Sequence, residues 1–348
     1  MRHCIKFFAL VVVVHCAVPL FAQQNVPPPA TAYATAPDIP YDSTPNFLKL
    51  PANLYLGEGI GVAKNSKGHV FVYTRSGDNS RLFEFDQEGN FVREIGQNLY
   101  AFQMAHAVRV DSQDNIWVVD EGTDMIVKFN PQGRVVMLMG RRPEYAEGLL
   151  ATPAPGAPPP PAVPYRFGRP TDVAWDAAGD IFVSDGYTNS RVAKYDKNGR
   201  FLKSIGSKGT EPYQFSTPHS IQTDAAGNVY VADRGNRRIQ VFSNDLVLRA
   251  IYDNVGAPWA VCITPGPHQY LYSSNSFPDN NNSLFAPVTG EVYKMELDGT
   301  VLGKFGKGGK QLKEFSTVHA MDCRGDNELL TAEITAWRVQ KITLHPSR

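Results

Sequence analysis

A stretch of fifteen residues recurs four times in this chain of 348 residues. An internal repeat constrains the fold more than any single motif, because each copy has to form the same structural unit. Each copy opens on histidine or threonine and closes on an acidic residue, and the copies span residues 106–120, 171–185, 219–233 and 319–333. Weaker copies begin at Ile60 and Trp259. The chain therefore contains six related units.

Short apolar runs alternate with turn residues inside each unit. Residues 107–139 divide into AVRV, DSQDN, IWVVD, EGTD, MIVKF, NPQG and RVVMLM. This pattern predicts four short antiparallel strands. Repeats of about 45 residues that hold four strands are typical of propeller blades, not of helical solenoids. We therefore expect an all-β fold, a six-bladed β-propeller, over residues 46–345.

The sequence before the repeats divides into two segments. Residues 1–22 carry Arg2, His3 and Lys6 and then a short apolar run, which is the pattern of a secretory signal peptide. The apolar run is too short to span a bilayer. We expect residues 23–45 to form a linker, and the protein to be secreted or periplasmic. A proline-rich insert at residues 143–166 is expected to form an extended surface loop.

The last unit ends after its third strand, near Leu344. We expect residues 46–56 to supply the missing outer strand, because joining the first and last blades leaves no exposed sheet edge.

Charge and cysteine content restrict the partners and the source of stability. The chain has 34 basic and 34 acidic residues, and it loses only basic ones with the signal peptide. Neither nucleic acid nor an anionic membrane is expected as a partner, and we expect a monomer. Cys262 and Cys323 are the two cysteines after the signal peptide, so the fold is not a disulfide scaffold. Whether these two cysteines are free is left open.

Histidine opens alternate units. The first residues of the six units are Ile60, His106, Thr171, His219, Trp259 and His319. Alternate blades of a six-bladed ring are about 120° apart, so His106, His219 and His319 should converge on the channel axis at one mouth. Three imidazoles that leave a fourth position open resemble catalytic zinc sites. The alternative is that they bind channel water or the acids that close the units. Those acids are expected to tie turns to neighbouring strands.

Three further side chains are expected at the same mouth, because the turn after each second strand returns there. Tyr187 lies in a turn with one residue more than its counterparts, which can aim the phenol inward. Near a divalent cation, that phenol could act as a base. Arg75 and Arg234 follow the second strands of units one and four, where a guanidinium could hold a substrate carboxylate. For each of the three, an ordinary surface turn residue is the alternative.

These residues resemble a known family. Residues 167–173 (FGRPTDV), 182–191 (FVSDGYTNSR), 214–220 (QFSTPHS) and 231–234 (VADR) are similar to the peptidyl-α-hydroxyglycine α-amidating lyases, NHL-repeat propellers that depend on zinc. The resemblance covers about residues 55–343. It implies that His106, His219 and His319 bind zinc, that Tyr187 and Arg75 are catalytic, and that Arg75, Tyr187 and Arg234 contact the substrate.

The reaction that the resemblance implies is the cleavage of a C-terminal α-hydroxyglycine into a peptide amide and glyoxylate. The enzyme would be a carbon–nitrogen lyase, and its substrate would be a peptide or small molecule with a terminal carboxylate.

The chain departs from the family next to the third histidine. The family has a methionine and a proline before it and an aspartate after it, where this chain has Thr317, Val318 and Ala320. In the family, that aspartate helps hold a calcium ion together with carbonyls that match Val62 and Val108, so Ala320 argues against calcium here. The family's four cysteines are also replaced.

Two other functions are compatible with the predicted fold. A propeller of this kind can bind a protein or glycan without catalysis, since fold does not fix function. A metal-dependent lactonase or hydrolase is also possible, although three histidines suit zinc better than the calcium of carboxylate-rich sites.

Overall fold

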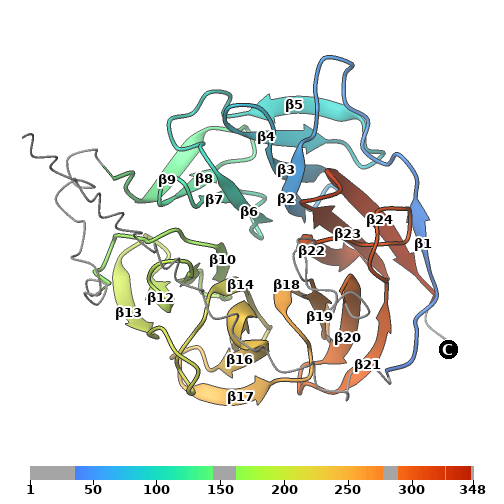
Figure 1. Ribbon diagram of the computed structural model, residues 1–348. Coiled ribbons are helices and arrows are strands. Elements are labelled where there is room, and N and C mark those ends of the chain that lie inside the picture. Colours follow the sequence, from blue (N-terminus) through green and yellow to red (C-terminus); the bar gives the residue numbers. More distant parts are fainter. Residues whose placement is uncertain (1–35, 144–161, 277–288, 326, 346–348) are drawn as a thin grey trace, which may run out of the picture.

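The structure is a computed structural model that describes residues 36–143, 162–276, 289–325 and 327–345. These residues form six antiparallel sheets of four strands, arranged as blades around a common axis (Figure 1). This confirms the predicted six-bladed β-propeller. The predicted signal peptide, and residues 144–161 of the proline-rich insert, lie outside the described residues. No helix among the described residues could cross a membrane.

Each blade takes its strands from consecutive segments of the chain, apart from the last. Blade one contains β2 (Glu58–Lys64), β3 (Val70–Arg75), β4 (Ser80–Phe85) and β5 (Phe91–Ile95). Blade two contains β6 (Ala105–Val110), β7 (Ile116–Asp120), β8 (Met125–Phe129) and β9 (Val135–Gly140). Blade three contains β10 (Asp172–Trp175), β11 (Ile181–Asp185), β12 (Arg191–Tyr195) and β13 (Phe201–Ile205).

The second half of the ring repeats this plan. Blade four contains β14 (Pro218–Thr223), β15 (Val229–Asp233), β16 (Arg238–Phe242) and β17 (Leu248–Tyr252), with a short 3-10 helix η2 (Arg234–Asn236) between β15 and β16. Blade five contains β18 (Pro258–Ile263), β19 (Tyr270–Asn275), β20 (Glu291–Glu296) and β21 (Val301–Phe305). Blade six contains β22 (Val318–Gly325), β23 (Glu328–Glu333), β24 (Arg338–Leu344) and β1 (Tyr41–Thr44).

The hydrophobic core lies between the blades. Six buried clusters each join two neighbouring blades. Phe182 of blade three packs in one cluster with Phe242 of blade four, for example. Because both faces of every sheet are covered by neighbours, the inner strands are buried almost throughout, their polar residues included.

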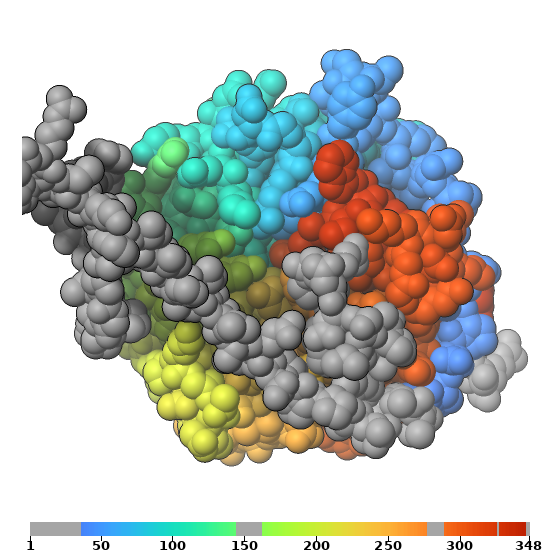
Figure 2. Space-filling model, viewed as in Figure 1, coloured from blue at the N-terminus to red at the C-terminus, as the bar shows by residue number. Residues whose placement is uncertain are grey.

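A strand from before the first blade closes the ring, as predicted, but residues 41–44 form that strand and residues 46–56 do not. Strand β1 pairs with β24, and Tyr41 lies opposite Leu344. Figures 1 and 2 show this early segment beside the end of the chain. The prediction that residues 46–56 close the ring is wrong, and the propeller begins inside the predicted linker. Residues 46–56 instead carry apolar side chains, including Phe47 and Leu54, that pack onto the cluster between blades one and six.

A β-bulge occurs where five of the six inner strands begin. In blade two, Ala105 pairs with Asp120 and Ala107 with Val119, so His106 is the extra residue. His219 and His319 are skipped in the same way in blades four and six. A bulge leaves one residue unpaired and re-aims its side chain. The bulges therefore turn the three histidines toward the channel axis.

Cys262 and Cys323 form a disulfide, which answers the question that the sequence left open. The bond joins β18 to β22, the inner strands of blades five and six. It closes a loop between cysteines that are 61 residues apart, and such loops restrict the unfolded chain.

Candidate metal centre

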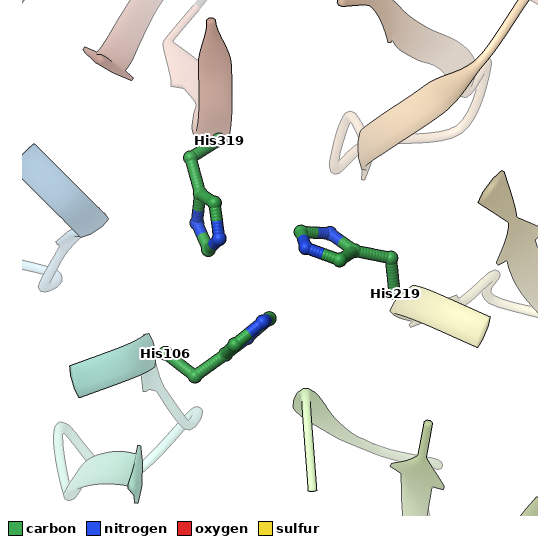
Figure 3. Close-up of side chains that lie close together, drawn as sticks. All are labelled: His106, His219 and His319. Carbon is green, nitrogen blue, oxygen red and sulfur yellow. The ribbon is translucent and has the colours of Figure 1, made fainter. Parts of the chain in front are cut away.

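His106, His219 and His319 meet on the channel axis (Figure 3). One ring nitrogen from each lies within 4.8 Å of the others. The ring centroids are 4.6 to 4.7 Å apart, and all three side chains are buried. The three histidines that open alternate blades therefore converge on one point, as the sequence predicts.

The three imidazoles are oriented by the same contact in each case. His106 Nδ1 lies 2.5 Å from the carbonyl oxygen of Thr171, which opens the next blade. His219 Nδ1 lies 2.7 Å from the carbonyl oxygen of Trp259, and His319 Nδ1 lies 2.8 Å from that of Ile60. A carbonyl only accepts, so Nδ1 must carry the proton and donate it. The lone pair of each ring is then on Nε2, the atom available to a metal.

The residues present fit a zinc ion. His219 Nε2 is buried without a hydrogen-bond partner among the described residues, a costly arrangement that a metal would relieve. Burial lowers the pKa of His106 and His219 well below the ordinary value, and it lowers the pKa of His319 to about 3. All three are therefore neutral at physiological pH, as metal ligands must be.

The acids that close the units do not orient the histidines. Asp120 accepts hydrogen bonds from the backbone of Gln103 and Met104 and from the hydroxyl of Tyr73. Asp185, Asp233 and Glu333 hold turns and arginines in a similar way. This confirms that they tie turns to strands, whereas the alternative that they bind the imidazoles is wrong.

Tyr187 points inward from its longer turn. Its hydroxyl lies 3.3 Å from His106 Nε2, and its ring packs edge-on against His106 and His219. Burial raises the pKa of Tyr187, and the guanidinium of Arg234 opposes that shift. A phenol at this position can exchange a proton with a ligand of the metal centre.

Arg75 is part of an ion-pair group that sequence reasoning did not predict. Its Nη2 donates to Glu121 Oε1 at 3.0 Å, and its Nη1 lies 3.5 Å from Glu58 Oε2. The buried Glu121 also accepts from Arg169 Nη2 at 3.3 Å. Burial raises the pKa of Glu121, while the two arginines lower it. Arg75 is thus already paired with carboxylates.

Arg169 is a site residue that the sequence analysis missed. Its guanidinium lies over the Tyr187 ring, 4.6 Å from the centroid, and its side chain is half exposed. Arg169 lies in the FGRPTDV segment that resembles the lyase family, and this is the feature of the sequence that could have indicated it. The sequence does not show that its guanidinium stacks on the ring of Tyr187.

Arg234 is better disposed to meet an anion than Arg75. Its guanidinium lies 4.2 Å from the Trp259 ring centroid and 5.6 Å from that of Tyr187. In the part of the chain that the structure describes, no carboxylate forms an ion pair with it. Arg75 and Arg234 both lie near enough to the histidines to lower their pKa values, but Arg234 differs from Arg75 in forming no ion pair with a described carboxylate.

The calcium site of the resembling family, which the sequence already made doubtful here, does not fit the residues present. Val62 and Val108 do lie on inner strands β2 and β6. Beside them, however, Ala320 brings no carboxylate, and the guanidinium of Arg109 reaches the carbonyl oxygen of Met321 at the matching position of blade six. A guanidinium that donates to the Met321 carbonyl oxygen disfavours a metal cation beside that atom.

The chain is similar to known proteins over one repeat and over much of its length. The NHL repeat family matches residues 215–242, which cover the first three strands of blade four. A probable peptidyl-α-hydroxyglycine α-amidating lyase of Caenorhabditis elegans is 30% identical over 216 residues, 55% of this chain and 57% of the relative. The chain is a six-bladed β-propeller that contains an NHL repeat, and its homologues include proteins named as amidating lyases.

Other relatives of this NHL propeller have different names. NHL repeat-containing protein 3 of mouse is 28% identical over 302 residues, covering 82% of this chain and 80% of the relative. A solved gluconolactonase of Xanthomonas campestris has a TM-score of 0.57 at 16% identity, covering 90% of this chain and 98% of that one, which is a likeness of fold alone. The propeller spans 28 to 57% of the length of the first lyase and monooxygenase relatives.

Proposed function

We propose that this propeller is a zinc-dependent lyase that cleaves an α-hydroxyglycine-type carbinolamide into an amide and glyoxylate. The observation that carries the proposal is the set of three inward imidazoles with the Tyr187 hydroxyl 3.3 Å from His106 Nε2. Homologues named as amidating lyases support the choice of reaction.

The reaction needs proton transfer and no external reactant. The hydroxyl of the substrate loses its proton, its oxygen forms a carbonyl, and the C–N bond breaks with its electrons on nitrogen. The nitrogen then takes a proton, so the two products together contain the atoms of the substrate. Neither water nor an oxidant is consumed.

The side chains divide this work among themselves. His106, His219 and His319 would hold zinc, which when bound would supply a Lewis acid that lowers the pKa of the substrate hydroxyl and of the phenol beside it. Tyr187 would take the hydroxyl proton and return one to the leaving nitrogen. Arg234 would hold the substrate carboxylate through its guanidinium, which forms no ion pair with a described carboxylate.

Two guanidinium groups over the Tyr187 ring favour its role as a base. Arg169 and Arg234 both lie within 6 Å of the ring centroid. Positive charges there stabilise the phenolate and oppose the effect of burial. Arg75 would act by fixing Glu121 and Arg169 and by contributing positive charge near the carboxylate.

The proposed setting is an exported, monomeric enzyme that acts on small or peptide substrates and on neither nucleic acid nor membranes. The Cys262–Cys323 disulfide supports export, because such bonds persist in oxidising compartments.

Zinc-loaded protein should release glyoxylate from hydroxyhippurate, a small mimic that needs few peptide contacts. Tyr187→Phe should lower kcat by about 100-fold or more and keep its zinc, because the phenol acts on a proton in motion. His69→Ala, a change in a histidine outside the centre, is the matched control and should retain full activity.

The competing function is a propeller that only binds a partner. NHL repeat-containing protein 3 of mouse, whose name gives no enzymatic activity, is covered over 80% of its length, against 57% for the lyase of Caenorhabditis elegans. For this reason a binding propeller is kept as the second candidate. No glyoxylate above background from wild-type protein with one zinc per chain would contradict the lyase proposal and favour this alternative.

A further inference from the structure

A buried ion pair lies in the channel beneath the three histidines. Arg109 Nε donates to Asp172 Oδ1 at 2.9 Å, and Arg109 Nη2 also contacts Asp172 Oδ2. The two residues are 8% and 2% exposed. Two charges are rarely removed from water to this extent unless each is fully paired.

The pair connects the inner strands of most of the ring. Asp172 Oδ2 accepts from the hydroxyl of Ser220 and from the backbone of Ile221 in blade four. Arg109 Nη1 donates to the carbonyl oxygen of Met321 in blade six at 3.3 Å. The Ser220 hydroxyl also accepts from the backbone of Val261 in blade five. Blades two to six therefore share one polar network.

This network has the chemical form of a cation site. Asp172 contributes a carboxylate, and Ser220 and Met321 contribute a hydroxyl and a main-chain carbonyl. These are the oxygen ligands that calcium prefers in proteins. Here the positive charge at their centre is the guanidinium of Arg109.

The network lies close to the three histidines along the inner strands. The four residues of the network follow the first residue of their blade by one position (Asp172, Ser220), two positions (Met321) or three positions (Arg109). A β-strand rises about 3.3 Å per residue, so they lie within about 10 Å of the level of the histidines. On the far side is a cavity of about 290 Å³ that inner-strand residues line, including Arg109, Cys262 and Asp322.

We propose that Arg109, held by Asp172, is a built-in cation that replaces a channel calcium ion in this propeller. The guanidinium joins the blades around the axis as a metal ion would, and its planar fork satisfies the carboxylate from both oxygens. The propeller then needs no calcium to hold its blades in register. This inference does not depend on the lyase reaction.

The proposal is tested by thermal unfolding of zinc-loaded protein and by metal analysis. Wild type purified in calcium-depleted buffer should contain less than about 0.1 calcium per chain, and millimolar calcium chloride should leave its Tm unchanged. One calcium per chain, or a clear rise in Tm with calcium, would overturn the proposal.

Variants test the guanidinium itself. Arg109→Met keeps an unbranched side chain without the guanidinium and leaves the buried Asp172 without a charged partner, so its Tm should fall by about 10 °C. The double variant Arg109→Met with Asp172→Asn removes both charges and should lose less. A Tm of Arg109→Met equal to that of wild type would contradict the role of the pair.

Smaller and charge-conserving variants complete the test. Arg109→Ala leaves the oxygens and opens space among them, so calcium should restore part of its lost Tm. If Arg109→Ala does not respond to calcium, the pair is structural only and the replacement claim is wrong. If Arg109→Ala does not fold, Arg109→Lys takes its place in the test. Its ammonium group keeps a positive charge among the oxygens, so its Tm should not change with calcium. A Tm of Arg109→Lys that rises with calcium would overturn the proposal.

Discussion

His319 Nδ1 in the last blade lies 2.8 Å from the carbonyl oxygen of Ile60 in the first blade, 259 residues earlier. The third histidine is therefore oriented by a residue on the other side of the ring closure. This links the metal centre to the pairing of β1 with β24, because that pairing holds blade six in its position beside blade one.

Removal of the closing strand should destabilise both the fold and the centre. A chain that begins at residue 46 lacks β1 and exposes the edge of β24. A chain that begins at residue 36 keeps β1, so the edge of β24 stays paired. We expect the shorter chain to have a Tm lower by at least about 5 °C and to bind zinc more weakly. Equal Tm values for the two chains would show that closure is unimportant.

Each of the three histidines should be required for zinc. Loss of one imidazole removes a third of the protein ligands, so His106→Ala, His219→Ala and His319→Ala should each weaken zinc binding by at least about 100-fold. Metal analysis and competition with a chromogenic chelator measure this. His69→Ala, which removes a histidine bound to Glu84 outside the channel, should retain one zinc per chain. Stoichiometric zinc in the triple variant would rule out the tripod.

The two predicted arginines should differ in their effects. Arg234→Lys removes the planar guanidinium and should raise KM for hydroxyhippurate by about 10-fold or more. Arg75→Lys should raise KM less, because the guanidinium of Arg75 is already paired with Glu121 and Glu58. Steady-state kinetics with zinc-loaded variants decide between them. A larger KM effect for Arg75→Lys would mean that Arg75 leaves its carboxylates to bind substrate.

The sequence was sufficient for the architecture and for the convergence of the histidines, because both follow from the period of the repeat. It was not sufficient for the closing strand, since residues 41–44 and 46–56 can each form a short strand and only packing of Phe47 and Leu54 separates them. The Nδ1 acceptors are main-chain carbonyls, which no residue type reveals. The Cys262–Cys323 bond likewise depends on how inner strands of neighbouring blades align.

Asp124, which lies near the mouth, should make the stability of the folded protein depend on pH. Its Oδ1 accepts from the backbone nitrogen of Arg169 at 2.6 Å, and burial raises its pKa from 3.8 to about 6. The folded state therefore binds this proton more tightly than the unfolded state does. As pH rises from about 4 to about 6, the folded protein must release that proton and loses stability, and above that window the cost is complete.

Asp124→Asn isolates this effect. The amide keeps an oxygen that accepts from Arg169, carries no charge, and tolerates the φ of 56° at this position. We expect the Tm of Asp124→Asn to exceed that of wild type by roughly 2–4 °C at pH 8, with the difference disappearing at pH 4, where wild-type Asp124 is protonated. Thermal unfolding at the two pH values measures this. A lower Tm for Asp124→Asn at pH 8 would mean that the ionised carboxylate stabilises the mouth through Arg169, and that its attraction to the guanidinium outweighs the cost of burial.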